Sequence, residues 1–227
     1  MPAVFGPIID KMLTDLVDDE WKTTRNVMTQ AFTSGKIKRM MESLNMYNNT
    51  LLEKMGERAD ADDMFEFKDL VGKCTLDIVA AIGFGIDAQV QNNPKSEFIT
   101  HSAEFSQAGF FRVAAGIIAV LAPALAPLVI KSGMGAIPQE TNAFFKNIMA
   151  QAIANRKADP NKHNDFLSLM LKAQDVEDED KRLKDDVILA NAIIFILAGY
   201  DSVSTTISWA AYEMALHQDI QEKVYEE

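Results

Sequence analysis

Hydrophobic side chains recur along most of the chain at helical spacing. Trp21, Arg25, Met28 and Phe32 fall at i, i+4, i+7 and i+11, which places them on one face of a helix that begins at Asp18. Alternation typical of a strand is nearly absent, residues 64–67 being its best example. We therefore predict a mainly α fold. Its other helices are expected over residues 8–16, 36–57, 68–82, 95–109, 138–157 and 167–172.

One segment, residues 186–216, predicts a helix much longer than the rest. From Val187 to Ala198 it is apolar on nearly every side and is interrupted only by Asn191. A helix over the whole segment would be about 46 Å long at roughly 1.5 Å per residue. A helix that is apolar all round is buried, so we expect it to be the central helix of the fold.

Polar residues gather in the middle of this long helix, in residues 199–206. A carboxylate and hydroxyls are costly to bury unless they are hydrogen-bonded. Ala198 and Gly199 carry almost no side chain, so a flat group has room to lie against the backbone. One interpretation is a cavity beside a locally opened helix, with Asp201 and Ser202 handling protons at its edge. The other is a crossing of two helices at small residues, with the hydroxyls satisfied internally.

Composition excludes some classes of protein. The 22 basic and 33 acidic side chains give a net charge of −11. This balance argues against nucleic-acid binding, which needs a basic face. One cysteine and three scattered histidines argue against a zinc cluster. Cys74 lies in an apolar helical stretch, and we expect it to be an inert core residue.

Several short motifs resemble those of one enzyme family. Residues 198–202, Ala-Gly-Tyr-Asp-Ser, resemble the central-helix motif Ala/Gly-Gly-x-Asp/Glu-Thr of the cytochrome P-450 monooxygenases. Trp21 and Arg25 are similar to the family's Trp-x-x-x-Arg. Further stretches similar to the family, in the same order, are residues 32–37, 164–170, 211–217 and 220–224. Their order over nearly the whole chain most resembles the animal microsomal clan, which oxidises drugs, toxins and steroids.

The resemblance implies haem as cofactor and names residues that would hold it. Trp21 and Arg25 would donate hydrogen bonds to a haem propionate, a role that suits an indole N–H and a guanidinium. Ala198 and Gly199 would lie over the haem face and leave room for dioxygen. We therefore expect both pairs to face one gap. The alternative is that Arg25 pairs with a nearby carboxylate while Trp21 fills the core.

The resemblance also assigns residues to catalysis and to substrate binding. Asp201 and Ser202 would occupy the acid and alcohol positions that relay protons toward dioxygen. Ser202 departs from the usual threonine and lacks the methyl group that restricts its rotamer. Ile194 and Leu197 would face a small apolar substrate. The alternative for these two is ordinary core packing.

Other parts of the family pattern are missing. The chain has no Phe-x-x-Gly-x-x-x-Cys-x-Gly segment, so we expect no axial cysteine and no metal ligand within it. The resemblance covers the middle of a family member, and residues 1–227 are interpreted as a single partial domain. The last helix has no stop signal, and we expect the chain to be truncated there, with a frayed terminal helix as the alternative. By resemblance, the complete protein would insert one atom of dioxygen into its substrate, with electrons from an NADPH-linked reductase, whereas the fragment alone would be inactive.

A membrane surface is the other expected partner. Residues 113–130 carry no charge and lie between Arg112 and Lys131. Pro123 and Pro127 would break a helix here. The resemblance implies short interfacial helices that roof the substrate entrance, on the cytosolic face of the endoplasmic reticulum. Buried core and a true membrane span are the alternatives. The rival function is a non-enzymatic helical module that binds lipid or a membrane surface.

Overall fold

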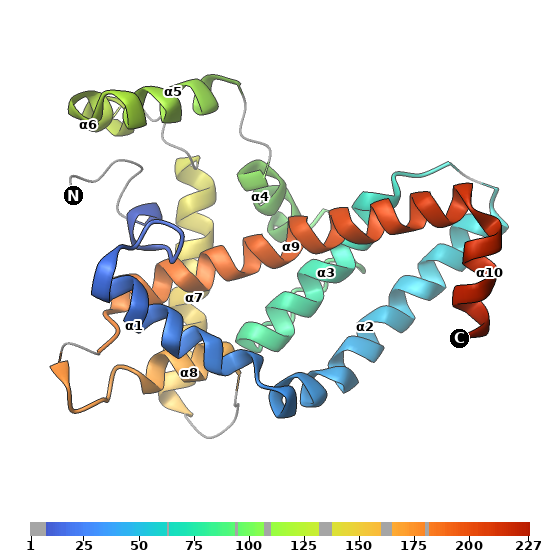
Figure 1. Ribbon diagram of the computed structural model, residues 1–227, viewed down its shortest axis with the longest axis horizontal. Coiled ribbons are helices and arrows are strands. Elements are labelled where there is room, and N and C mark those ends of the chain that lie inside the picture. The colour runs from blue at the N-terminus through green and yellow to red at the C-terminus, as the bar shows by residue number, and fades with distance from the viewer. Residues whose placement is uncertain are drawn as a thin grey trace.

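The computed structural model describes residues 8–62, 64–93, 95–106, 110–131, 138–159, 165–179 and 182–227. Within these ranges every regular element is a helix, which confirms the predicted mainly α fold (Figure 1). The α-helices are α1 (Asp18–Thr29), α2 (Ser34–Asp60), α3 (Phe67–Phe84), α4 (Glu97–Ser106), α5 (Phe110–Leu121), α6 (Ala126–Lys131), α7 (Gln139–Ala158), α8 (Phe166–Lys172), α9 (Asp185–Leu216) and α10 (Gln218–Glu226). The 3₁₀ turns are η1 (Ile9–Lys11), η2 (Gln30–Phe32) and η3 (Pro123–Leu125).

Helix α9 is the long helix that the sequence predicts, and it crosses the whole molecule in Figure 1. It packs most extensively on α3 and also contacts α4, α7 and α8. Its N-terminal half is buried because apolar residues occupy nearly all of its sides. The buried apolar residues of this half are Val187, Ile188, Ala190, Ala192, Ile193, Ile196 and Leu197.

Helices α3 and α9 cross at glycines, which lets their backbones approach closely. A Cβ atom built on Gly199 of α9 would lie 2.6 Å from Val79 Cγ2. A Cβ atom on Gly72 of α3 would lie 2.9 Å from Tyr200 Cε2. Real Cβ atoms do not approach other atoms so closely, so a larger residue at Gly199 would displace Val79 or its helix, and one at Gly72 would displace the Tyr200 ring.

The predicted helix over residues 8–16 is largely wrong. The structure has only the single 3₁₀ turn η1 there, followed by irregular turns. The backbone N–H of Leu13 is hydrogen-bonded to the side chain of Asn191, 2.8 Å away, instead of to a helical carbonyl. A tertiary contact therefore replaces the local helix.

The ends of several helices follow their sequence signals. Gly85 adopts the left-handed conformation, φ 63°, and ends α3 as predicted. Asp165 caps α8 by accepting a hydrogen bond from the Ser168 N–H at 2.9 Å. The buried Arg156 of α7 binds Asp165 and also donates to the Phe84 carbonyl at 3.2 Å, so it ties three helix ends together. Asn164, part of a motif quoted above, lies outside the described residues.

Helices α5 and α6 pack on each other and stand apart from the other helices in Figure 1. The turn η3 at Pro123 separates them, as the prolines predict. With 12 residues, α5 is about 18 Å long, too short for a hydrocarbon core of about 30 Å. Several of the large apolar side chains described here are exposed, so the segment is not core: Ile117, Ile118, Val120, Leu121, Leu125 and Leu128.

Among the described residues, α9 is the one helix whose length and composition would let it cross a membrane. Half of its most apolar stretch is buried inside the protein. A core helix has the same length and composition as a membrane span. The packing of α9 against α3, α4, α7 and α8 accounts for its apolar character.

Candidate functional site

One face of α9 carries exposed small residues at the point where the helix leaves the buried core, and exposed side chains continue through its C-terminal half. Phe195, Ala198 and Ser202 fall on this face, at i, i+3 and i+7. Ala198 and Ser202 are both exposed. The Ser202 hydroxyl donates to the Ala198 carbonyl, with 2.6 Å between the oxygens. We call the exposed surface of Ala198 and Ser202 the α9 strip. It offers a small-residue surface and one hydroxyl to whatever lies against it.

Gly199 is not part of the α9 strip, because one of its Cα hydrogen atoms faces helix α3 on the side where a Cβ atom would lie. Its Cβ direction is filled by Val79 of α3, so this glycine serves the helix crossing. Tyr200, next along the helix, lies over Gly72, and its carbonyl accepts a hydrogen bond from the Thr75 hydroxyl at 3.3 Å. Burial, and then the charges of neighbouring aspartates, raise the pKa of the Tyr200 phenol. On this side of Gly199 the two helices pack closely, as in the alternative that the sequence left open, and a haem contact of Gly199 stays a prediction.

Three further hydroxyls of this region are hydrogen-bonded within the helix. The Ser204 hydroxyl donates to the Asp201 carbonyl at 3.1 Å, and the Thr206 and Ser208 hydroxyls donate to carbonyls four residues earlier, at 2.8 and 2.7 Å. Helix α9 is continuous from Asp185 to Leu216. Of the two interpretations that the sequence left open, this continuous helix agrees with the helix crossing, because the hydroxyls add bonds without breaking the helical ones.

Asp201 is held by a residue that the sequence analysis missed. Lys68, in the first turn of α3, places its Nζ 2.9 Å from Asp201 Oδ1. Both side chains are a little under half exposed. The carboxylate is therefore paired across the helix crossing and is held by α3. Lys68 lies 133 residues away in the chain, so no local pattern indicates this pair.

Trp21 and Arg25 contact each other on α1. The Arg25 guanidinium carbon lies 5.9 Å from the centroid of the Trp21 ring. Trp21 is 39% exposed and Arg25 is exposed, whereas the buried side of α1 carries Thr24 and Met28. Trp21 is thus not core filler, and among the described residues no carboxylate forms an ion pair with Arg25. An indole and a guanidinium are available together for an acidic group.

An aromatic contact joins the end of α1 to the open face of α9. Phe32, in the turn η2 that follows α1, lies 5.9 Å from Phe195 between ring centroids. Phe195 stacks on Phe166 of α8 at 4.0 Å. The chain that carries Trp21 and Arg25 therefore reaches the same side of α9 as Ala198. It stays a prediction that Trp21 and Arg25 face the same gap as the α9 strip.

The two residues expected to face substrate are placed differently. Leu197 is 3% exposed and belongs to the core, which is the alternative left open for it. Ile194 is half-buried and packs against the core. A substrate contact stays a prediction for both residues.

Cys74 is an inert thiol in this fold, as its sequence context predicts. Its Sγ lies 3.6 Å from the Tyr47 carbonyl and 3.7 Å from Asn48 Oδ1. Burial, with a smaller effect from Asp77, raises the pKa of the thiol to about 12. The residue is thus protonated at neutral pH and does not serve as a thiolate ligand.

The site as a whole defines a class of protein. An exposed indole and guanidinium suit the acidic groups of a cofactor, and the α9 strip suits a flat face. A fold of helices around one long buried helix, with these two surfaces, fits a helical protein that binds a flat, acidic cofactor. The family model of cytochrome P450 matches residues 8–227, and the chain belongs to that family. Members of this family bind haem, which is such a cofactor.

Curated relatives of the same family cover nearly the whole chain. Cytochrome P450 3A31 of Mesocricetus auratus is 34% identical over 227 residues. Cytochrome P450 3A9 of Rattus norvegicus is 32% identical over 228 residues, and cytochrome P450 3A56 of Fundulus heteroclitus is 32% identical over 225. Each match covers 98% of this chain and 45% of the relative. The chain therefore spans under half the length of these relatives, and its similarity to the animal microsomal type is confirmed.

Proposed function

We propose that this chain belongs to a haem-dependent monooxygenase that inserts one atom of dioxygen into a small apolar organic substrate. Its electrons would come from NADPH through a reductase. The observation that carries the proposal is the family match over residues 8–227. Bound haem supplies the activation of dioxygen. The rival function, a non-enzymatic lipid-binding module, is less favoured because the match extends far beyond the apolar α5–α6 pair.

The chain's own residues then have distinct tasks. Arg25 and the indole N–H of Trp21 bind the acidic groups of the haem, and the contact between them orients the guanidinium. Because the side chain of Ala198 is only a methyl group, a flat ring system can lie close to the α9 strip. Ser202, exposed and rotatable, holds a water molecule when its hydroxyl leaves the Ala198 carbonyl. When Lys68 releases the Asp201 carboxylate, that carboxylate takes up a proton from solvent and passes it on toward the water held by Ser202.

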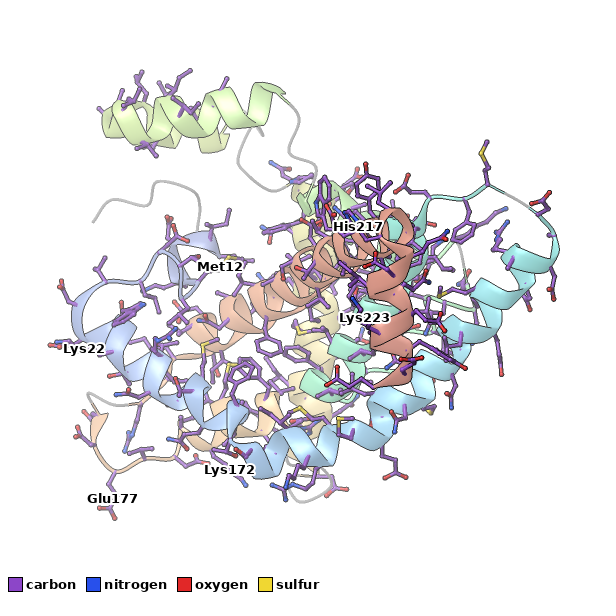
Figure 2. The ribbon with its side chains drawn as sticks, turned by 45° about the vertical axis from the view of Figure 1, so that its right-hand side comes forward. Met12, Lys22, Lys172, Glu177, His217 and Lys223 are labelled. Atoms are coloured by element: carbon purple, nitrogen blue, oxygen red, sulfur yellow. The ribbon has the colours of Figure 1, made fainter. Side chains whose placement is uncertain are left out.

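Haem retention in the full-length protein tests these assignments. We expect a carbon-monoxide difference band for the unaltered protein, and faster loss of haem in Arg25→Ala and Trp21→Phe. A hydrogen bond to a charged group contributes about 1.5–3 kcal/mol, so each variant should lose haem roughly tenfold faster or more. Lys22→Ala is the matched control, because Lys22 sits on the same helix, is exposed (Figure 2), and pairs with Asp19 at 3.1 Å. Haem loss at the same rate in all three variants would overturn the assignments.

The location that we propose is the cytosolic face of the endoplasmic reticulum, with α5 and α6 at the membrane surface. Their exposed apolar side chains, among them Leu121 at 79% and Leu128 at 65%, support this placement. Binding of the full-length protein to phosphatidylcholine vesicles should weaken several-fold in Leu121→Ser/Leu128→Ser. Met64→Ser is the control, since Met64 is even more exposed, at 97%, but lies between α2 and α3. Equal binding by both variants would exclude the α5–α6 surface as the contact.

A further inference from the structure

Asn191 is the one polar residue of α9 between Val187 and Ala198, and it is completely buried. Its Oδ1 accepts a hydrogen bond from the Leu13 N–H at 2.8 Å. Its Nδ2 donates to the Lys11 carbonyl at 3.0 Å and to the Val187 carbonyl at 2.8 Å. Both amide donors and the oxygen are therefore used, and two of the three bonds join α9 to residues 8–16, here called the N-terminal segment.

The N-terminal segment leads directly into α1. Met12 and Leu16 are buried in the core, so the segment is packed down as well as hydrogen-bonded. Figure 2 shows Met12 turned toward the body of the protein. Lys11 also reaches Glu20, in the first turn of α1, at 3.4 Å. The position of the beginning of α1 thus depends on the segment that Asn191 holds.

The two attachments of α1 lie on one face of α9. Asn191, Phe195, Ala198 and Ser202 follow one another at i, i+4, i+7 and i+11. Asn191 holds the chain before α1, and Phe195 contacts Phe32 just after it. The attachments therefore fix both ends of the helix that carries Trp21 and Arg25, along the stripe that ends in the α9 strip.

We infer that Asn191 is a positioning residue that sets the placement of α1 against α9, and thereby the fit of Trp21 and Arg25 to the cofactor. This inference rests on the proposed function. A leucine at this position would fill a similar volume, but it would leave the Leu13 N–H without its partner. An unpartnered buried donor is more costly than the loss of the bond itself. The segment would then move toward water, and the start of α1 would move with it.

The test uses the full-length haem protein and the variant Asn191→Leu. Two quantities are measured: the rate of haem transfer to an excess of a haem-scavenging apoprotein, and hydrogen–deuterium exchange of the amides in residues 11–13. We expect haem loss at least about fivefold faster, together with faster exchange in that segment. Ile193→Val is the control, because Ile193 is equally buried but lies about 200° around the helix from Asn191.

If Asn191→Leu does not fold, the same two measurements are made on Asn191→Ser. The serine hydroxyl can still donate to the Val187 carbonyl, but the side chain is too short to bond to Lys11 or Leu13 of the N-terminal segment. Faster exchange in residues 11–13 with haem loss within twofold of the unaltered protein would overturn the inference. Unaltered exchange would overturn it too. Failure of the proposed function is distinct, because the unaltered protein would then bind no haem at all.

Discussion

Lys68 of α3 and Asp201 of α9 form an ion pair across the crossing of the two helices, with 2.9 Å between Nζ and Oδ1. The carboxylate expected to supply protons is thereby turned toward α3, and the adjacent Ser202 faces outward. Proton supply through Asp201 thus requires that the pair open. Since both partners are nearly half exposed, opening is cheap.

The variant Lys68→Met should change turnover more than stability. Exposed pairs contribute about 0–1 kcal/mol, so the thermal midpoint should hardly move. Without the lysine, the Asp201 carboxylate is free to turn, and we expect the ratio of peroxide released to product formed to change at least twofold. Lys73→Met is the matched control, because Lys73 pairs with Asp69 at 2.6 Å on the same helix. If Lys68→Met and Lys73→Met gave the same ratio of peroxide to product, proton supply through Asp201 would not depend on Lys68.

Ser202→Thr should improve coupling. The added methyl group restricts the side-chain rotamer and holds the hydroxyl, now 2.6 Å from the Ala198 carbonyl, in one place. We expect less peroxide per substrate oxidised in the full-length protein. Ser208→Thr makes the same change at a hydroxyl bonded at 2.7 Å to Ser204, two turns further on. If the two variants release equal peroxide, the hydroxyl of Ser202 has no special role.

Gly199→Ala should destabilise the fold by about 1–3 kcal/mol, measured by denaturant unfolding. The new methyl group would meet Val79 Cγ2 at 2.6 Å, so the helices must shift. Val79→Ala should recover part of the loss when combined with it, which a double-mutant cycle detects. Gly56→Ala of α2 has no atom within 4 Å and should stabilise by up to about 1 kcal/mol. A neutral effect at Gly199 would contradict the close crossing.

Cys74 should resist thiol reagents in the folded protein up to pH 9. Its folded-state pKa of about 12 lies above the ordinary 9.0. The folded state therefore binds this proton more tightly than the unfolded state, and the resulting stability is present below pH 9 and lost as the pH rises toward about 12. Labelling with iodoacetamide should follow unfolding, and Cys74→Ala should show a shallower loss of stability over that pH range. Rapid labelling at pH 8 would contradict this placement.

Sequence pattern located most of the helices because their causes are local. The stop at Gly85 and the cap at Asp165 depend on neighbouring residues only. The N-terminal segment was misjudged for the opposite reason, since Asn191, 178 residues away, takes the Leu13 N–H that a helix would use. The close packing of Gly199 on Val79 could not be predicted from a local pattern either, because Val79 comes from another helix.

The sequence by itself determined the helical class, the long buried helix and the family, because hydrophobic period and motif order are properties of the chain alone. Tertiary structure alone decided which side chains meet. It paired Asp201 with Lys68, closed Gly199 against Val79 and joined Asn191 to Leu13. Each of these contacts spans more than 100 residues, so only the packing of helices against one another brings the partners within reach.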